Sequence, residues 1–319
     1  MISTRNNNPW FRKEWLMPER MRSHEPLSKR ISKNKISYLM IAPYFVLFSI
    51  FTVIPFIASI ALSFTYFNML ETPRFIGLSN YTGLFLNDDV FLIAIQNTLI
   101  FAFITGPLSY VVCFFFAWLI NELPKIPKIF ITLVFYAPAL AGNFTFIWSV
   151  IFSTDQYGLL NGTLMNLGIL DEPIAWLTNP STSMISLIIV QLWLSLGASF
   201  LAFIAGFKTV DRQTYEAGAI DGIRNRWQEL FFITIPQMKP QMLFGAIIQI
   251  ATSFAVGGIS IALAGFPSTD YSAHTIMTHI HDYGNIRFDM GYASAISVVL
   301  LLVMLLVNKV ITSLLLEKD

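Results

Sequence analysis

Charged side chains are scarce in this chain of 319 residues: Asp, Glu, Lys and Arg make up 12% of it, against 55% for hydrophobic residues. So little polar surface excludes an ordinary soluble domain and is typical of a protein that lies in a lipid bilayer. Cysteine is limited to Cys113, which stands in an apolar run. A single cysteine excludes an intrachain disulfide, so we expect Cys113 to be a small buried hydrophobic side chain.

Six long intervals contain no charged residue. A helix that crosses the bilayer needs about 20 apolar residues and tolerates few ions, so each interval is long enough for one span. The intervals predict an all-α membrane protein with six transmembrane helices, and they lie between residues 35 and 71, 89 and 122, 128 and 155, 172 and 208, 239 and 270, and 289 and 309. We therefore expect one six-helix domain over residues 36–319. The uncharged segment 156–170 is rich in Gly and Asn, which favours a loop or a short interfacial helix.

Lysine and arginine are distributed unequally between the two sides of this topology. Eighteen of the 20 fall in the N-terminal tail (residues 1–35), in the second and fourth connections, or after the last interval. Segments rich in Lys and Arg stay on the cytoplasmic side during insertion, so we expect a multi-pass protein of the cell membrane with both termini in the cytoplasm. The first apolar run lacks an A-x-A-like cleavage site and is expected to remain as an anchor. The basic tail fits an amphipathic segment on anionic lipid and a solvated tail equally well.

The fourth connection, residues 211–240, is long enough to fold into a structure of its own. We expect Asp211 to cap a first short helix and Gly222 to interrupt it through a turn with positive φ. Asp221 is expected to cap the helix that follows.

We expect this second helix to begin at Asn225, to be amphipathic, and to end at Pro236, which disrupts a helix. Its buried face would consist of Trp227, Leu230 and Phe231. Two short helices joined at a glycine make a stiff unit. A stiff unit transmits force between a soluble partner and the spanning helices, whereas a flexible loop does not.

Three short segments of this connection form an ordered pattern. They are Glu216-Ala217-Gly218, Asp221-Gly222 and Ile233-Thr234-Ile235-Pro236. The pattern resembles the EAA signature of permease subunits in binding-protein-dependent ABC importers. Gly218 stands where a second alanine is usual, and the interval from Gly222 to Pro236 is one residue longer than in the commonest form.

Other segments resemble the carbohydrate branch of that family, which includes the maltose and glycerol-3-phosphate permeases. They comprise residues 75–81 with Asn97-Thr98, residues 157–161, Trp176-Leu177, and Trp193 with Gly197. The likeness extends over residues 38–316.

The resemblance implies a type I ABC importer permease fold in which residues 211–240 form a cytoplasmic helical coupling loop. It implies a heterodimer with a second permease subunit, two ATPase subunits, and an extracytoplasmic solute-binding protein that delivers a sugar or oligosaccharide. No nucleic-acid partner is implied. The residues of this chain that would couple to the ATPases are Glu216, Ala217, Gly218, Asp221, Gly222 and Pro236.

The chain contains no G-x-x-x-x-G-K-[ST] motif, the pattern that cradles nucleotide phosphates. We therefore expect partner ATPase subunits to bind ATP and Mg. We expect neither a cofactor nor a catalytic residue in this chain, which is then not an enzyme.

Neutral sugars are recognised by aromatic faces and hydrogen-bonding side chains, which also pack ordinary helix interfaces. Analogy with the family points to the third helix and to the helices that flank the coupling loop. The candidates for a substrate path are Trp193, Gln191, Gln249 and Ser253, with Asn143 and Tyr136 in addition. For each of them, a role in contacts between helices is the alternative.

Three histidines, His274, His279 and His281, lie close together in the last connection and suggest a shared cation. We expect no metal there, because a polar loop that docks the binding protein has the same composition. The acids at positions 88, 89, 155, 171 and 172 fit the same docking surface, or simple solvation.

Other classes of protein share this topology. A secondary transporter usually has ionisable residues within its spans, and the six intervals contain none. A scaffold or receptor subunit has no reason to carry a coupling loop. A permease for amino acids or peptides shares the EAA signature, and only the carbohydrate-branch segments speak against it.

Overall fold

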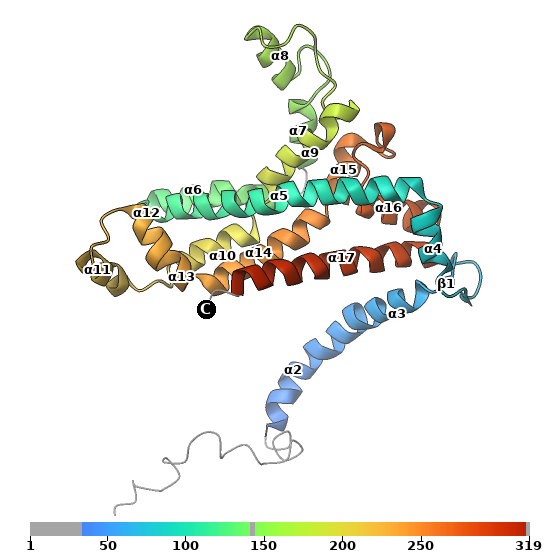
Figure 1. Ribbon diagram of the computed structural model, residues 1–319, viewed down its shortest axis with the longest axis horizontal. Coiled ribbons are helices and arrows are strands. Elements are labelled where there is room, and N and C mark those ends of the chain that lie inside the picture. The colour runs from blue at the N-terminus through green and yellow to red at the C-terminus, as the bar shows by residue number, and fades with distance from the viewer. Residues whose placement is uncertain (1–33, 141–143, 317–319) are drawn as a thin grey trace, which may run out of the picture. The chain divides into compact units, whose positions relative to one another are not determined.

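The computed structural model describes residues 34–140 and 144–316, which are almost entirely helical (Figure 1). One short antiparallel hairpin pairs β1 (Thr65–Tyr66) with β2 (Arg74–Phe75). The prediction of an all-α fold is confirmed. The helices in chain order are α2 (Lys35–Phe48), η3 (Ser49–Val53), α3 (Ile54–Leu62), α4 (Ser79–Leu86), α5 (Asp89–Asn121), α6 (Lys125–Leu140), α7 (Phe144–Ile151), α8 (Leu159–Asn166), α9 (Pro180–Leu194), α10 (Ala198–Phe207), α11 (Arg212–Ile220), α12 (Arg226–Glu229), η4 (Leu230–Thr234), α13 (Ile235–Gln237), α14 (Lys239–Phe254), α15 (Gly257–Ala264), η5 (Thr269–Tyr271), α16 (Ile276–His281), η6 (Asp282–Ile286) and α17 (Met290–Leu316).

Three stretches are each long and apolar enough to cross a membrane alone: residues 35–62, α5, and residues 290–313 of α17. Three further pairs of consecutive helices are long and apolar enough only when the two helices are taken together: α6 with α7, α9 with α10, and α14 with α15. The last two pairs are bent by 41° and 42°. Within residues 34–140 and 144–316, the helices therefore allow three spans, or up to six if every pair is one span, and they overlap the six expected intervals.

The chain divides into two units, residues 1–58 and residues 59–319, and the boundary lies within α3. The described part of the first unit is one apolar helical stretch whose side chains are exposed, as at Leu39 and Phe51. Residues 1–33, nearly the whole of the expected basic tail, lie outside the described residues, as does the path candidate Asn143.

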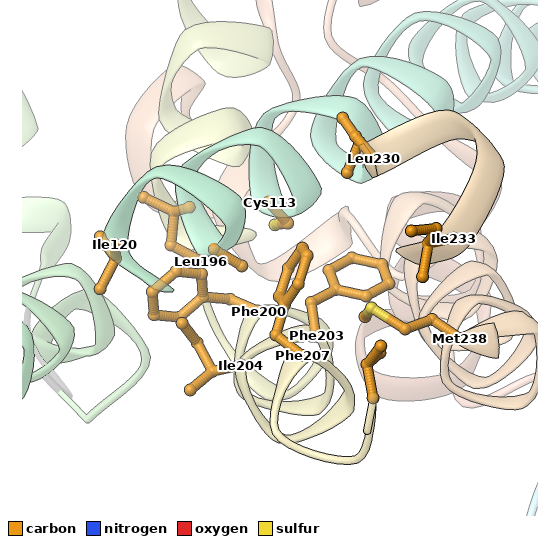
Figure 2. Close-up of a cluster of buried hydrophobic side chains, with 12 residues drawn as sticks. Cys113, Ile120, Leu196, Phe200, Phe203, Ile204, Phe207, Leu230, Ile233 and Met238 are labelled. Carbon is orange, nitrogen blue, oxygen red and sulfur yellow. The ribbon is translucent and has the colours of Figure 1, made fainter. Parts of the chain in front are cut away.

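The core of the second unit is built where α5, α10 and α14 pack together. Its centre is Phe203, which is fully buried and meets Tyr110 and Phe114 edge to face at 5.4 and 5.5 Å between ring centroids. Figure 2 shows Phe203 among side chains from α5, α10 and the segment that follows α12. A glycine on α14, Gly245, allows this ring to lie against the helix, because a Cβ atom there would stand 2.6 Å from Phe203 Cζ.

We expect Gly245→Ala to destabilise the protein. A fully buried ring has no room to move, and overpacking of this kind costs about 1–3 kcal/mol. The change is expected to lower the Tm measured by intrinsic tryptophan fluorescence of the detergent-solubilised chain.

Gly258→Ala is the matched control, since Gly258 also lies in a helix and a Cβ there meets nothing within 4 Å. It is expected to leave the Tm unchanged or raise it slightly, because alanine is favoured over glycine inside a helix by about 0.5–1 kcal/mol. Equal Tm values for both variants would contradict the packing argument.

Candidate functional site

Residues 211–240 fold into a compact helical loop, which we call the 211–240 loop. Asp211 caps α11 as predicted, because its carboxylate accepts a hydrogen bond of 3.0 Å from the backbone N–H of Gln213. The helix ends at Ile220, and Gly222 has a φ of +96°, which glycine adopts without strain. Both predictions for the first helix are confirmed.

The cap of the next helix is Asn225, not Asp221. Asn225 Oδ1 accepts the backbone N–H of Gln228 at 2.8 Å. Asp221 lies directly after α11, and its backbone N–H bonds back to Ala217. The prediction for Asp221 is therefore wrong, because the chain passes through Gly222 and a further extended stretch before α12 begins.

The second half of the loop also differs from the expected amphipathic helix. It runs through α12, η4 and α13, of which η4 is a π-helical turn. Leu230 is buried as predicted, but 53% of Trp227 and 58% of Phe231 are exposed. Pro236 lies in the first turn of α13 and does not end the run, because a residue in the first turn needs no backbone N–H donor.

α11 presents two different faces. Its inner face packs on η4: Gly218 is buried, and a Cβ there would stand 2.6 Å from Ile233 Cδ1. The hydroxyls of Tyr215 and Thr234 form a hydrogen bond of 2.8 Å at the same contact. The other face carries Glu216 and Ile220, both exposed. Glycine at 218 thus allows close packing of α11 while Glu216 points away.

Glu216 has one ionic partner in the described part of the chain. Its Oε1 lies 3.3 Å from Arg212 Nε, one helical turn earlier. Both side chains are largely exposed, so solvent screens this pair and its contribution to stability is small. Ala217 beside it is exposed as well.

The loop is fastened to the C-terminal end of α5. Arg226 Nη2 lies 3.2 Å from Glu122 Oε2, just beyond α5, and Arg226 Nη1 lies 2.7 Å from Glu229 Oε2. The rings of Trp118 and Trp227 are 4.9 Å apart. Figure 2 shows Leu230 and Ile233 in the same buried cluster as side chains of α5 and α10, which include Cys113, Ile120, Phe200 and Phe203.

Gln249, a candidate for the substrate path, is buried on α14. Its amide Nε2 lies 3.2 Å from Cys113 Sγ of α5 and 3.4 Å from the carbonyl oxygen of Ser195, where α9 gives way to α10. Ser253, one turn later, donates its hydroxyl to the carbonyl oxygen of Ile250 at 2.9 Å. Gln249 therefore joins three helices, which is the alternative role left open by the sequence.

A cavity of about 420 Å³ lies between α5, α14 and α17. Gln249 and Ser253 contribute to its walls, together with Gly106 and Tyr110 of α5 and Val307 of α17. The other lining residues are apolar. Gln249 Nε2 and Ser253 Oγ are engaged with neighbouring protein groups, so the cavity offers few free polar atoms.

The candidates Trp193 and Gln191 lie elsewhere, on α9. Trp193 meets Trp148 of α7 at 5.7 Å, and Trp148 stacks on Phe152 at 5.4 Å. Phe152 in turn lies 6.3 Å from Trp176, so the four rings form a continuous row. Trp148 Nε1 has no hydrogen-bond partner among the described residues. Gln191 is buried, and Tyr136 of α6 is half-buried.

The outer end of this aromatic row is anchored by Asn161 of α8. This fully buried amide accepts Trp176 Nε1 at 2.8 Å and the backbone N–H of Ile174 at 3.1 Å. It also donates to the carbonyl oxygens of Ser153 and Ile174 at 3.1 and 3.0 Å. One side chain thus holds the chain between α7 and α9 in place.

A buried polar cluster connects the start of α5 with the segment between α15 and α17, which we call the 265–289 loop. Asp88 Oδ2 accepts from Tyr292 at 3.0 Å and from Tyr283 at 3.3 Å, and it lies 3.0 Å from His279 Nε2. His279 Nδ1 lies 3.1 Å from His274 Nε2. Both imidazoles are almost completely buried, so the sequence-based expectation of a surface docking loop is wrong for these two histidines.

The protonation states in this cluster follow from the geometry. Burial acts to raise the pKa of Asp88, but the backbone N–H of Phe91, with His279 and Tyr292, outweighs it and the pKa is lowered. Burial lowers the pKa of His279 despite the neighbouring carboxylate. A neutral His279 that donates from Nε2 must accept at Nδ1, so His274 donates from Nε2. His274 Nδ1 is then a lone pair, and it has no partner among the described residues.

The charged neighbours of the cluster are paired with each other. Arg287 Nη2 lies 2.6 Å from Asp282 Oδ2, and the guanidinium stands 4.4 Å from the centre of the Tyr283 ring. His281 is separate, with its Nδ1 2.9 Å from Asn285 Nδ2 at the surface. Only the short spacing of the histidines indicated this cluster in the sequence. The carboxylate that completes it, Asp88, is 191 residues from His279.

We expect acid to loosen the 265–289 loop. Burial, reinforced by His279, lowers the pKa of His274 from 6.5 to about 4. An exposed imidazole takes up a proton where the buried one does not, so the folded loop is fully stabilised above pH ~6.5 and loses stability as the pH falls toward 4. Hydrogen exchange of residues 274–286 in the full-length chain, corrected for intrinsic rates, is expected to rise about tenfold or more between pH ~7.5 and ~5.

His281→Gln is the matched control and is expected to keep this pH dependence, because His281 lies outside the buried cluster. His274→Gln is expected to reduce it. A dependence in His274→Gln as large as in the parent chain would show that another group is responsible.

Comparisons with known proteins agree with this architecture. A family model described as "Binding-protein-dependent transport system inner membrane component" matches residues 123–315. The probable ABC transporter permease protein YesP of Bacillus subtilis (strain 168) is 31% identical over 291 residues, which cover 89% of this chain and 92% of that protein. The arabinooligosaccharides transport system permease protein AraP of the same organism is 32% identical over 280 residues, 87% of each chain.

A solved structure has the same fold. It is a chain of a bacterial alginate ABC transporter in complex with an alginate pentasaccharide-bound periplasmic protein. The match has a TM-score of 0.71 at 25% identity and covers 88% of this chain and 96% of that one.

Proposed function

The chain belongs to the family of binding-protein-dependent transport system inner membrane components, and on that premise we propose that it is the transmembrane subunit of an ATP-driven importer of sugars or oligosaccharides. The observation that carries the proposal is the 211–240 loop. It is fixed to the core through Leu230 and Ile233 and presents an exposed α11. Such a loop transmits a push from a partner instead of absorbing it.

The partners we propose are a second permease subunit, two ATPase subunits that bind ATP and Mg, and an extracytoplasmic solute-binding protein. The sequence supports the ATPases as separate chains, because it holds no phosphate-binding motif of its own. The family description names dependence on a binding protein, and the alginate transporter is a complex with a periplasmic one. Both termini and the 211–240 loop would lie in the cytoplasm of a cell-membrane protein, in line with the distribution of Lys and Arg.

Sugars and oligosaccharides are the proposed substrates. The names of the relatives support this class, since AraP belongs to an arabinooligosaccharides transport system and the alginate transporter is in complex with a periplasmic protein that holds an alginate pentasaccharide. The row of rings from Trp193 to Trp176 supports it physically, because aromatic faces bind sugar rings by stacking. We propose that Trp193 and Gln191 line the path, and Gln249, Ser253, Tyr136 and Asn143 remain candidates.

We propose that α11 is the surface that the ATPases engage. Glu216 and Ala217 are exposed on this helix. Gly218 lets the helix pack closely on η4, and Gly222 forms the turn that follows it. Asp221 and Pro236 complete the coupling set. An exposed carboxylate such as Glu216 makes a charge-assisted hydrogen bond of about 1.5–3 kcal/mol when a partner donates to it.

We expect Glu216→Ala to leave membrane insertion intact and to uncouple ATP hydrolysis from transport, because it removes the charged contact without touching the core. The measurement is uptake of labelled oligosaccharide per ATP hydrolysed, in proteoliposomes that hold the complex copurified with the tagged full chain. Arg212→Gln is the control: it breaks the ion pair between Arg212 and Glu216 but keeps the Glu216 carboxylate, and it is expected to behave like the parent. Normal binding-protein-stimulated transport in Glu216→Ala, or purification without an ATPase subunit, would refute the proposal.

We expect Trp193→Ala and Gln249→Ala to act differently. Trp193→Ala removes a ring from the row and is expected to reduce uptake about tenfold with little loss of Tm, since stacking on an aromatic side chain contributes ~1 kcal/mol or more. Gln249→Ala leaves the Ser195 carbonyl with fewer partners and is expected to lower the Tm as well. Unchanged uptake in both variants would remove the two residues from the path.

A further inference from the structure

α5 is one unbroken helix that contacts a different loop at each end. It comprises 33 residues, which at about 1.5 Å per residue gives a length of about 50 Å. Figure 1 shows α12 beside its C-terminal end, and α4 and α16 beside its N-terminal end. The helix therefore reaches from the 211–240 loop to the 265–289 loop.

At the C-terminal end the fastening is both ionic and aromatic. Arg226 of the loop pairs with Glu122 at 3.2 Å, and Trp227 packs on Trp118 at 4.9 Å. Glu229 holds the other side of the Arg226 guanidinium at 2.7 Å, which fixes its direction. Leu230, three residues after Trp227, continues this contact into the adjoining buried cluster.

At the N-terminal end α5 binds the backbone of the 265–289 loop directly. Asn97 Nδ2 donates to the carbonyl oxygens of Tyr271 and His274 at 2.9 and 2.8 Å. The hydroxyl of Thr98 accepts the backbone N–H of Ile276 at 2.9 Å and is itself bonded to Ala94 of α5. Together with the contact between Asp88 and His279, these bonds leave the loop little freedom to move without α5.

Two neighbouring helix pairs are less suited to such a connection. α9 with α10 and α14 with α15 are bent by 41° and 42°, and a bend lets one half move without the other. α5 is long and apolar enough to span the membrane as one helix, and it continues through Pro107 without a break.

We propose that α5 is the rod that links movement of the 211–240 loop to movement of the 265–289 loop. Arg226 with Glu122, and Asn97 with Thr98, are its positioning residues. This inference rests on the proposed function, in which ATPase subunits drive the 211–240 loop. It adds a route by which nucleotide binding on one side changes the opposite side, where a binding protein would dock.

The test is hydrogen exchange of residues 271–281 in the copurified complex, with and without a non-hydrolysable ATP analogue. We expect the nucleotide to change exchange in this segment. Arg226→Glu is expected to reduce that change about twofold to fivefold, the range that an exposed ion pair supports. Glu122→Arg combined with Arg226→Glu, both in a Glu229→Gln background that removes the like charge beside position 226, restores the pair with opposite polarity and is expected to restore the change.

Two further variants separate transmission from folding. Arg224→Glu is the matched control, since it reverses an exposed charge in the same loop, two residues away, at a residue whose backbone N–H bonds to Gln228, and it is expected to behave like the parent. Asn97→Ala breaks the opposite fastening and is expected to keep the nucleotide response of residues 211–240 while losing that of residues 271–281.

Three results would overturn the proposal: no nucleotide response in residues 271–281 of the parent, a full response in Arg226→Glu, or a charge swap that fails to restore it. Failure of the proposed function would look different, because no ATPase would then copurify with the chain. In that case no ATPase would move the 211–240 loop, and both the proposed function and the proposed role of α5 would be refuted.

Discussion

Backbone N–H and C=O groups in an apolar layer need partners within the protein, because lipid offers none. This constraint bears most heavily where a helix bends. The bend between α9 and α10 is held by Gln249, whose amide reaches the Ser195 carbonyl across from α14 while it also touches Cys113. In the 265–289 loop, the carbonyl of Ala273 is likewise satisfied by a side chain, since it accepts the Ser260 hydroxyl of α15. At the bend between α9 and α10, a polar side chain thus supplies the partner that the lipid does not.

The same constraint divides the polar residues of the spans into two groups. Gln249 and Ser253 have their polar atoms directed at protein groups, which leaves the cavity beside them apolar. The row from Trp193 to Trp176 is different, because its members contact one another through their rings and, within the described part of the chain, only Trp176 has its indole N–H bonded to a protein group, Asn161. This difference is why we propose the α7–α9 side, and not the cavity between α5, α14 and α17, as the sugar path.

The sequence was informative wherever the physical signal is local. The absence of charge located the apolar stretches, and Asp211 and Gly222 marked the limits of α11. It failed where the deciding contact is distant. Trp227 looked like a core residue in its own helix, but its partner is Trp118, more than 100 positions earlier, and together they lie near the surface. Asp88 looked like a solvated acid for the same reason, because its partners lie in the last quarter of the chain.

The π-helical turn η4 has a consequence for how this family tolerates changes in length. A π turn closes its hydrogen bond over five residues instead of four, so it accommodates one additional residue without lengthening the path. The spacing between Gly222 and Pro236 is one residue longer than the commonest EAA form, and Leu230–Thr234 lies inside that interval. A π turn at this point is the geometry that takes up one additional residue, while Gly218 still packs against Ile233 and Pro236 still lies at the start of α13.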